Sequence, residues 1–327
     1  MSKIKIAFDV GNSALKIALW RGRALTLHEV PLPENLVEDD RIAMPHAFSS
    51  FLRSVRRELR LPAGPAGLVL PTSRCICRLV TLPRMTVEQL ELNLPYEFND
   101  FIHGDAGQYY CDYAVCRQDP PADGGEPQEL VMMAAAVERQ LVRDFTRMFS
   151  GGGFSLRRIL PQEMALMALS AGEGERCFID LGRQSTRIAL FRGDRLQAQR
   201  QVPVGCRDLE DAVGEALRVD ARLAQSYLRS GREDVLDHPL CQAVYDRIAV
   251  EVLKVVNFYR YTYRNTRLDG VYLTGGGASV APLRRAVTGR LELPALPLED
   301  LVPVEGGAEL LPSCACAAGA AVQGEEA

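Results

Sequence analysis

Two short stretches of the chain place an aspartate directly before a glycine-bearing turn with hydroxyl residues beside it. FDVGNSALKIALWRG (8–22) contains Asp9, and IDLGRQSTRIALFRG (179–193) contains Asp180. A tight turn of this type exposes backbone N–H groups that can cradle a phosphate. The carboxylate has the wrong charge to touch that phosphate, but it can hold Mg²⁺ or its waters. The two stretches therefore predict phosphate-binding turns, with Asp9 and Asp180 serving a metal.

The two stretches are copies of one unit. Between Asp9–Leu25 and Asp180–Leu196, 8 of 17 positions are identical without a gap, at a constant spacing of 171 residues. The shared residues include an aspartate, two glycines and an arginine, which chance similarity between amphipathic strands does not readily supply. A single D-x-G would indicate only a turn, so the repetition favours a binding site. We expect two duplicated lobes, each carrying one turn.

A third glycine-rich element follows later in the chain. DGVYLTGGGASVAPLRRAV (269–287) predicts an apolar strand, a run of three glycines, and a helix with Pro282 in its first turn. Because no Cβ intervenes, the backbone of these glycines can approach a base or a sugar-phosphate closely. A run of glycines alone would be weak evidence, but beside two phosphate turns it completes a nucleotide site.

The elements that must position the first two turns are β-hairpins. Apolar residues alternate on both sides of the first turn, at Ile4, Ile6, Phe8, Leu15, Ile17 and Leu19. Dinucleotide-binding and P-loop fingerprints need a glycine loop that opens a helix, and neither hairpin supplies one. Those two kinds of site are therefore excluded, and the strands with the later helices predict an α/β fold.

Composition sets the class of protein. The 327 residues are 47% apolar and 24% charged, and the net charge of −4 favours neither nucleic acid nor an acidic membrane surface as a partner. Nine cysteines stand in apolar contexts without a disulfide framework, a zinc-ligand spacing or a signal peptide. No apolar run approaches the ~20 residues of a bilayer span. We expect a cytoplasmic protein that something else must hold wherever it works at a membrane.

The two hairpin turns with the late strand, glycine loop and helix resemble the actin-like ATPase superfamily, which includes actin, sugar kinases and heat-shock chaperones. Within it, the chain is most similar to the PilM family of type IV pilus assembly proteins, which is related to the division protein FtsA. The stretches that carry this resemblance are LPTSRCICRLVTLPRMTVEQLELNLPYEF (70–98), ELVMMAAAVERQLVRDFTRMFSGGGFSLRRIL (129–160), EVLKVVNFYR (251–260) and CAAGAA (316–321).

The resemblance implies an actin-like ATPase fold, which is an α/β fold of two duplicated lobes with a small α+β subdomain inserted in the first. Residues 1–65 and 151–172 would form the first lobe. Residues 66–150 would form the inserted subdomain, and residues 173–327 the second lobe.

The resemblance also implies ATP and Mg²⁺ as ligands. The first phosphate loop would take Asp9, Gly11, Asn12, Ser13 and Lys16. The second would take Asp180, Gly182, Arg183, Gln184, Ser185 and Thr186, and the adenosine motif Gly275, Gly276 and Gly277. Glu251 and Lys254 lie on a helix that borders the nucleotide in the family. Glu163 and Asp180 would be the catalytic pair, with Glu163 positioning the attacking water, while Asp9 and Asp180 hold the metal.

The chain departs from the family at two places that bear on activity. Arg183 and Gln184 stand where relatives favour small residues, and their bulk can either clamp a phosphate or crowd it out. Gln225 and Leu228 or Arg229 stand where relatives carry an acid and a lysine that grip the adenosine. We therefore expect slow or absent ATP turnover and leave open whether the protein is an enzyme.

The resemblance implies a protein partner. In the family, the N-terminal cytoplasmic peptide of PilN, an inner-membrane protein, docks in a groove between the first lobe and the inserted subdomain. This would recruit the chain to the inner face of the cytoplasmic membrane without direct insertion, and self-association stays open. The apolar residues expected near the groove are Leu79, Val80, Leu82, Leu90, Leu94, Tyr96 and Phe98.

Two other functions share the phosphate loops. A sugar or acid kinase also needs a catalytic acid in a substrate pocket between the lobes, and no acid is evident for that role. A filament former like FtsA ends in an amphipathic membrane helix, whereas VQGEEA (322–327) is too short and too acidic for one. A separate feature is a basic helical face of Arg53, Arg56, Arg57 and Arg60, which we interpret as solvated, with contact to a partner as the alternative.

Overall fold

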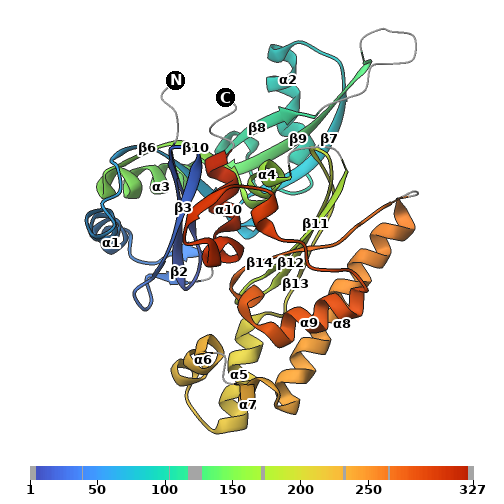
Figure 1. Cartoon of the computed structure of the whole chain (residues 1–327). Coiled ribbons are helices and arrows are strands. Elements are labelled where there is room, and N and C mark those ends of the chain that lie inside the picture. The colour runs from blue at the N-terminus through green and yellow to red at the C-terminus, as the bar shows by residue number, and fades with distance from the viewer. Residues whose placement is uncertain are drawn as a thin grey trace.

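The computed structural model describes residues 5–38, 40–102, 104–116, 127–170, 174–230, 233–263 and 266–322. Within these residues the chain forms sheets of six, four, three and two strands. The two larger sheets stand on either side of a central layer, and the three-stranded sheet lies at the top of the molecule (Figure 1). The acidic terminal residues 323–327 lie outside the described ranges. The architecture is the α/β class that the sequence predicts.

The six-stranded sheet contains the first hairpin. Its order is β10-β6-β1-β2-β3-β15, antiparallel from β1 to β3 and parallel elsewhere. Apolar side chains alternate between its two faces, so that β1 and β2 are buried on both. The strands are β1 (Ile6–Val10), β2 (Ala14–Arg21), β3 (Ala24–Pro31), β6 (Gly64–Leu70), β10 (Phe154–Pro161) and β15 (Val304–Gly306).

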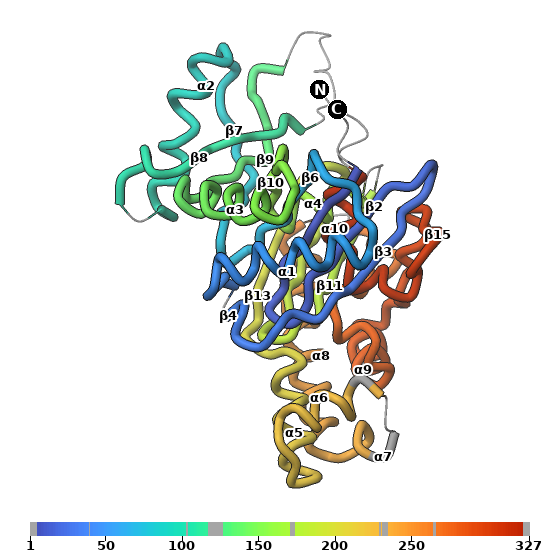
Figure 2. Tube along the Cα trace, turned by 90° about the vertical axis from the view of Figure 1, so that its left-hand side faces the viewer, coloured from blue at the N-terminus to red at the C-terminus, as the bar shows by residue number. Residues whose placement is uncertain are grey.

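Helices α1 (Pro45–Glu58) and α3 (Arg139–Gly152) lie side by side on the outer face of this sheet (Figure 2). Pro45 opens α1 at a position where its missing N–H costs nothing, and Phe48, Leu52 and Val55 point inward at helical spacing. They pack with Phe8 of β1 and Phe149 of α3 in one core cluster. The short strands β4 (Val37–Glu38) and β5 (Arg41–Ile42) form a separate two-stranded pair before α1.

The four-stranded sheet repeats the pattern of the first. Its order is β13-β12-β11-β14, an antiparallel meander followed by one parallel strand. The registers of the two hairpins correspond, with Asp9 opposite Lys16 and Asp180 opposite Arg187. The strands are β11 (Glu175–Leu181), β12 (Thr186–Arg192), β13 (Arg195–Val202) and β14 (Tyr272–Thr274). The predicted duplication is therefore present in the backbone.

Five helices, counted within the described residues, pack on or beside the outer face of the four-stranded sheet (Figure 1). Ile179 and Ile188 of the sheet share one core cluster with Ile248 and Val252 of the long helix α8. The helices are α5 (Cys206–Leu217), α6 (Ala221–Ser230), α7 (Glu233–Leu236), α8 (Pro239–Thr262) and α9 (Ala281–Leu291).

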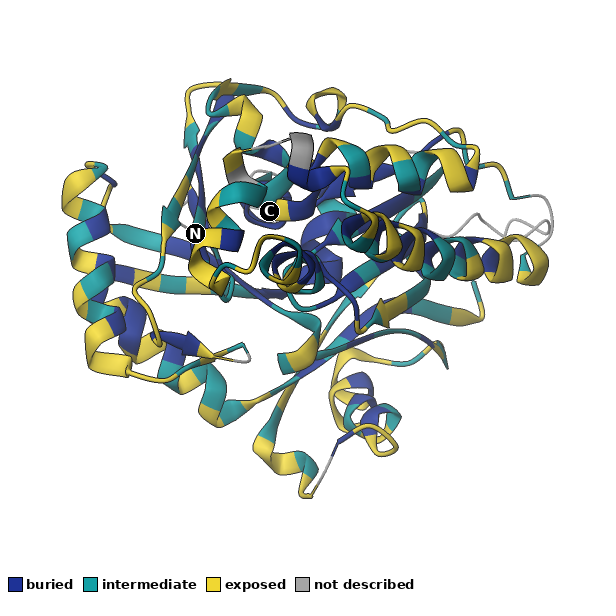
Figure 3. Ribbon diagram, turned by 90° about the horizontal axis from the view of Figure 1, so that it is seen from below, coloured by how far each residue is buried: buried dark blue, intermediate teal, exposed yellow. Residues whose placement is uncertain are grey.

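Two helices fill the space between the two larger sheets. They are α4 (Gln162–Leu169) and α10 (Leu311–Val322), and nearly every residue of α10 is buried. The small residues of CACAAGAA let α10 approach α4 closely, and a Cβ on Gly319 would lie 1.9 Å from the carbonyl oxygen of Ala165. Figure 3 shows the buried residues concentrated in this layer and in the strands beside it.

The end of the chain returns to the first lobe. β15 pairs with β3, and α10 packs on β1 and β2, with the Trp20 indole donating to the carbonyl oxygen of Ala321 at 3.0 Å. The segment from 304 to 322 therefore completes the six-stranded sheet and its core. We propose that it belongs structurally to the first lobe, although residues 173–327 were assigned to the second lobe from the sequence.

The three-stranded sheet has the order β7-β9-β8, with α2 (Val87–Asn93) on it. Its strands are β7 (Ile76–Pro83), β8 (Tyr109–Val115) and β9 (Glu129–Glu138). By contrast, β6 and α3, which the sequence assigned to the same subdomain, pair and pack with the six-stranded sheet. We propose 76–138 as the inserted subdomain. Short 3₁₀ helices occur at Thr72–Arg74, Leu94–Phe98, Ala106–Gln108, Gly276–Ser279, Leu298–Asp300 and Ala308–Leu310.

The crossing of α4 and α10 generates a prediction about stability. Gly319→Ala should lower the free energy of unfolding by about 2 kcal/mol or more, because the added methyl overlaps backbone that cannot move alone. Gly289→Ala in α9 is the matched control, since no described atom beyond its chain neighbours and the backbone of its own helix lies within 4 Å of the position that its added methyl would take. It should be neutral or stabilising by ~0.5–1 kcal/mol. Urea denaturation measures both, and equal effects would contradict the role given to the crossing.

Candidate functional site

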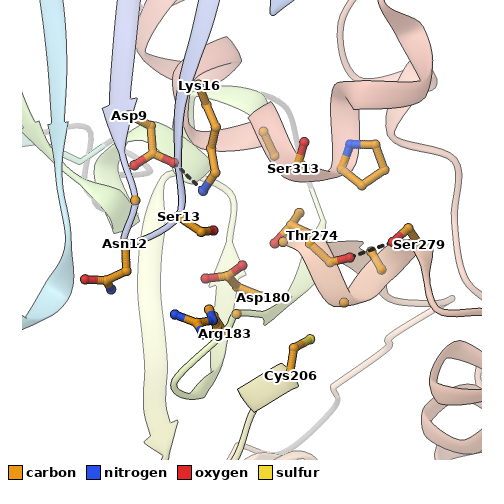
Figure 4. A pocket seen from close by; sticks show the side chains of 18 of the residues that line it. Asp9, Asn12, Ser13, Lys16, Asp180, Arg183, Cys206, Thr274, Ser279 and Ser313 are labelled. Atoms are coloured by element: carbon orange, nitrogen blue, oxygen red, sulfur yellow. Dashed lines mark hydrogen bonds and ion pairs between the residues drawn. The ribbon is translucent and has the colours of Figure 1, made fainter. Parts of the chain in front are cut away.

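A cleft between the two larger sheets brings the three glycine-bearing elements together. It has a volume of about 510 Å³ and is lined by both hairpin turns and by residues 274–280. Figure 4 shows Asp9, Ser13 and Lys16 on one side of the cleft and Asp180 and Thr274 on the other. The duplicated turns therefore face each other, as expected if they share one ligand.

The first turn carries an ion pair. Lys16 Nζ lies 3.1 Å from Asp9 Oδ2, across the hairpin from it. Burial lowers the pKa of Lys16, but the charges of Asp9 and Asp180 raise it more, so the net shift is upward. The backbone N–H of Gly11 donates a hydrogen bond to the carbonyl oxygen of Ala14 at 3.0 Å, which closes the turn. Lys16 is therefore a fixed cation at the edge of the cleft.

The second turn carries the corresponding ion pair. Arg187 Nη1 lies 3.4 Å from Asp180 Oδ2, and that oxygen also accepts a hydrogen bond from Gln162 Nε2 at 3.0 Å. Gln162 is the first residue of α4, so the central helix layer orients the carboxylate. Each aspartate of the repeat is thus paired with the cation that its own hairpin places opposite it.

The third element packs directly against the second turn. Gly275 has a φ of +82°, and a Cβ there would lie 2.4 Å from Asp180 Oδ1. Its N–H donates to the carbonyl oxygen of Pro312 at 2.8 Å, which fixes the loop to the start of α10. Among the described residues the buried hydroxyl of Thr274 has no hydrogen-bond partner. A polar ligand in the cleft can supply one.

Most of the residues assigned from the sequence line this cleft. They are Asp9, Gly11, Asn12, Ser13, Lys16, Asp180, Gly182, Arg183, Gln184, Ser185, Gly275, Gly276 and Gly277. The cleft is also lined by Gln225 and Leu228, which were identified as departures from the family, while the side chain of Arg229 is outside the described set.

Three assigned residues lie elsewhere. Thr186 is buried, and its hydroxyl donates to the carbonyl oxygen of Val204 at 2.9 Å, so it supports the turn and does not line the cleft. Glu251 and Lys254 pair with each other at 2.6 Å on α8 and do not line the cleft either. They lie one helical turn apart on a partly exposed face, while the buried residues of α8 face the core.

Glu163 is also outside the main cleft. It lines a second cavity of about 250 Å³, which adjoins the cleft through Gln162, Asp180 and Arg187. Its Oε1 accepts a hydrogen bond from Thr72 at 2.6 Å, and its buried Oε2 has no partner among the described residues. The residue of α4 that lines the cleft is its neighbour Gln162, and the water-positioning role of Glu163 stays a prediction.

Several polar residues of the cleft were not assigned from the sequence. Asp40 exchanges two hydrogen bonds with Asn12, at 2.7 and 2.9 Å, and lies 3.9 Å from Arg187 of the other sheet. The alignment of Lys16 with Arg187 in the repeat was a signal for the second cation. No local pattern marks Asp40, because its partners are distant in sequence.

Arg183 of the second turn is held by a buried acid. Its guanidinium lies 2.8 Å from Glu210 Oε2, and Gln225 Nε2 donates to the other oxygen of the same carboxylate at 3.2 Å. The hydrogen bond to Glu210 raises the pKa of Arg183. Its charge is thus partly neutralised within the second lobe.

The charges of the cleft suit a nucleotide carried as its magnesium complex. Within the described residues six carboxylates line the cleft against four cationic side chains, so an uncomplexed polyanion would meet an excess of negative charge. No cluster of three or more His, Cys, Asp or Glu in the described ranges forms a metal cage. Mg²⁺ held by one or two carboxylates and phosphate oxygens needs no such cage. The volume lies in the usual range for ligand pockets.

The residues expected near a partner groove fall into two groups. Val80, Leu90, Leu94 and Phe98 are buried in the core of the three-stranded sheet, so they are packing residues. Leu79 and Leu82 are partly buried, and Tyr96 is 70% exposed.

In the part of the chain that the structure describes, no helix is long and apolar enough to cross a membrane.

Comparisons with known proteins identify the family and the fold. The profile of the family described as type IV pilus assembly protein PilM matches residues 8–302. A solved structure described as the PilM-PilN type IV pilus biogenesis complex matches with a TM-score of 0.83 and 22% identity over 100% of both chains. No curated protein matches the chain in sequence.

A second solved structure, ethanolamine utilization protein EutJ from Carboxydothermus hydrogenoformans, matches with a TM-score of 0.59 and 14% identity. That match covers 97% of this chain and 89% of EutJ. At these identities the two likenesses establish the fold, and the expected actin-like ATPase fold is confirmed.

Buried Glu163 generates a prediction about pH. Burial raises the pKa of its carboxyl above the ordinary value of 4.5, so the folded protein holds this proton to a higher pH than the unfolded chain does. The stability that depends on the neutral carboxyl is present below about pH 4.5 and is lost as pH rises toward the folded-state pKa. Glu163→Gln removes this loss and keeps an oxygen for Thr72.

Urea denaturation of wild type and Glu163→Gln between about pH 5 and pH 8 measures the effect. The stability of the variant relative to wild type should increase with pH. Glu91→Gln, which changes an exposed carboxylate on α2, should show no such increase. A relative stability of Glu163→Gln that is constant or falls with pH would contradict the prediction.

Proposed function

The chain belongs to the PilM family of type IV pilus assembly proteins, and we propose that it acts as a scaffold that binds Mg-ATP between its lobes and a PilN-like peptide at its surface. The observation that carries the nucleotide proposal is the pair of facing turns, each with its own aspartate and cation. Membership of a pilus assembly family favours a scaffold over the alternative of a sugar or acid kinase.

Each part of the cleft has a role in this proposal. Asp9 and Asp180 would hold Mg²⁺ or its waters, and the backbone of the two turns would hold phosphates, with Lys16 and Arg187 beside them. The Gly275–Gly277 loop would lie against the adenosine. A bound metal and polyphosphate would supply charges that both lobes contact, which stabilises one arrangement of the lobes over others.

The resting ion pairs bear on affinity. Lys16 and Arg187 neutralise the two aspartates in the unliganded cleft, so Mg²⁺ would have to displace or share these partners. Phosphate oxygens would then take over the released cations. Binding in this form exchanges one set of charge pairs for another, and the metal and the phosphates depend on each other.

The first test is calorimetry of nucleotide binding with and without Mg²⁺. Asp9→Ala and Asp180→Ala should each weaken binding of Mg-ATP by ~10- to 100-fold, since contacts to charged groups contribute ~1.5–3 kcal/mol. Without Mg²⁺ the same variants should bind ATP no more weakly than wild type, because each frees a cation. Glu251→Ala is the matched control, as its carboxylate does not line the cleft. Wild-type affinity for Mg-ATP in both variants would contradict the assignment.

We also propose that the partner is the N-terminal cytoplasmic peptide of a PilN-like membrane protein. A solved relative is described as a PilM-PilN complex. Of the residues expected near the groove, Leu79, Leu82 and Tyr96 retain exposed surface. Docking of this peptide would recruit the protein to the inner face of the cytoplasmic membrane. A short peptide loses chain entropy on ordering, so we expect micromolar affinity.

The second test measures binding of a fluorescent peptide, made from the N-terminal segment of the PilN-like partner, by anisotropy. Tyr96→Ala should weaken binding by about 10-fold, because exposed aromatic residues at interfaces often contribute more than 1 kcal/mol. Tyr261→Ala removes a tyrosine that is 90% exposed on α8 and should have no effect. Equal affinities of the two variants would remove Tyr96 from the proposed groove.

A further inference from the structure

The outer surface of the first lobe carries an arginine-rich face that neither nucleotide nor peptide binding uses. Arg53, Arg56 and Arg57 lie on α1, and Arg60 follows it. Together with two serines and Leu61 they line an open hollow. Arg53, Arg57 and Arg60 are exposed and Arg56 is half-buried. The hollow is therefore surrounded by positive charge.

This positive charge has no paired carboxylate in the part of the chain that the structure describes. Within the described residues none of the four arginines forms an ion pair with a carboxylate. Arg53 donates to neutral groups, the carbonyl oxygen of Gly151 and the hydroxyl of Ser50, both at 2.8 Å. Like charges three and four residues apart repel on a helix. The face therefore holds an unfavourable charge arrangement that an anionic partner would relieve.

The basic face continues onto α3. The contact between Arg53 and Gly151 joins the two helices, and Figure 2 shows α1 and α3 together on the side facing the viewer. α3 exposes Arg143 and Arg147, and Arg147 lies 3.8 Å from Asp144. This concentration occurs in a chain whose net charge is −4. The net negative charge of the chain, which does not favour an acidic partner, is therefore accompanied by a local surface of positive charge.

The shape and chemistry of this face favour a surface with many anionic groups. Leu61 is the apolar residue lining the hollow, and it is buried, so no anchor pocket for a peptide side chain is present there. The backbone groups of α1 and α3 are hydrogen-bonded within their own helices, so they cannot pair with an extended peptide as a sheet edge does. Among the described residues that line the hollow there is no aromatic side chain to stack on a nucleic-acid base. The planar guanidinium group of arginine can donate two parallel hydrogen bonds to the oxygens of a phosphate.

We propose that the α1/α3 arginine face binds the anionic phospholipid headgroups of a membrane surface. This rests on the proposed function in one respect, which is that the PilN-like partner holds the protein near a membrane. α3 follows directly from β9, so this helix begins at the inserted subdomain, and the hollow lies toward its other end, where Arg53 donates to Gly151. A weak peptide contact and a weak lipid contact made together give an attachment stronger than either.

The experiment is co-sedimentation of the full chain with vesicles, without partner peptide or nucleotide. Wild type should bind vesicles of phosphatidylcholine with about 30% phosphatidylglycerol and not vesicles of phosphatidylcholine alone, and binding should fall with added salt. The variant Arg57→Gln/Arg60→Gln/Arg143→Gln should reduce the partition coefficient on the order of 100-fold. A matched control, Arg222→Gln/Arg285→Gln/Arg290→Gln, removes the same charge from exposed positions on α6 and α9 and should bind like wild type.

Each outcome decides the proposal. Equal wild-type binding to both kinds of vesicle, or equal loss in both triple variants, overturns it. Binding of polyglutamate or duplex DNA without binding to anionic vesicles also overturns it, and assigns the face to another partner. If the first triple variant fails to fold, the wild-type dependence on phosphatidylglycerol and salt still decides. Because no peptide is present, failure of the peptide proposal leaves this test unaffected.

Discussion

The close crossing of α4 and α10 is the contact on which the rest of the structure depends. Gly319 brings the backbone of α10 against Ala165 of α4, and this pair fills the space between the two large sheets. The spacing of the sheets therefore follows from small residues, since larger ones would push the helices apart. Both helices also begin at the cleft: Gln162 of α4 donates to Asp180, and Pro312 of α10 accepts from Gly275. A packing contact between residues that do not line the cleft thus affects its geometry.

The cleft is a balanced electrostatic arrangement. Each hairpin places a cation opposite its own aspartate, and Asp40 links the first turn to Arg187 of the second sheet. The duplicated sequence explains this, because two copies of one hairpin put acid and base in corresponding register. The charged groups of the cleft are therefore held in position by one another.

Local sequence patterns were sufficient to predict the hairpins, the glycine loop, the α/β class and the family. The features that were missed depend on orientation or on distant contacts. Successive helical residues point about 100° apart, so a one-residue difference separates Gln162 in the cleft from Glu163 in the cavity behind it. Glu251 and Lys254 lie on α8 and do not line the cleft. Asp40 meets Asn12 across 28 residues, and apolar periodicity does not distinguish the core residue Phe98 from the exposed Tyr96.

The return of the chain to the first lobe has a consequence for folding during synthesis. β3 ends at residue 31, and β15, which pairs with it, begins at residue 304. At ~5–20 residues per second, the ribosome needs roughly 14–55 s to make the intervening segment. During that time the inner face of the nascent first sheet lacks α10, so apolar residues such as Ala7, Ala18 and Leu25 have no cover. The first lobe is thus the first to be translated and the last to be completed, which makes its exposed sheet a substrate for chaperones until the final helix emerges.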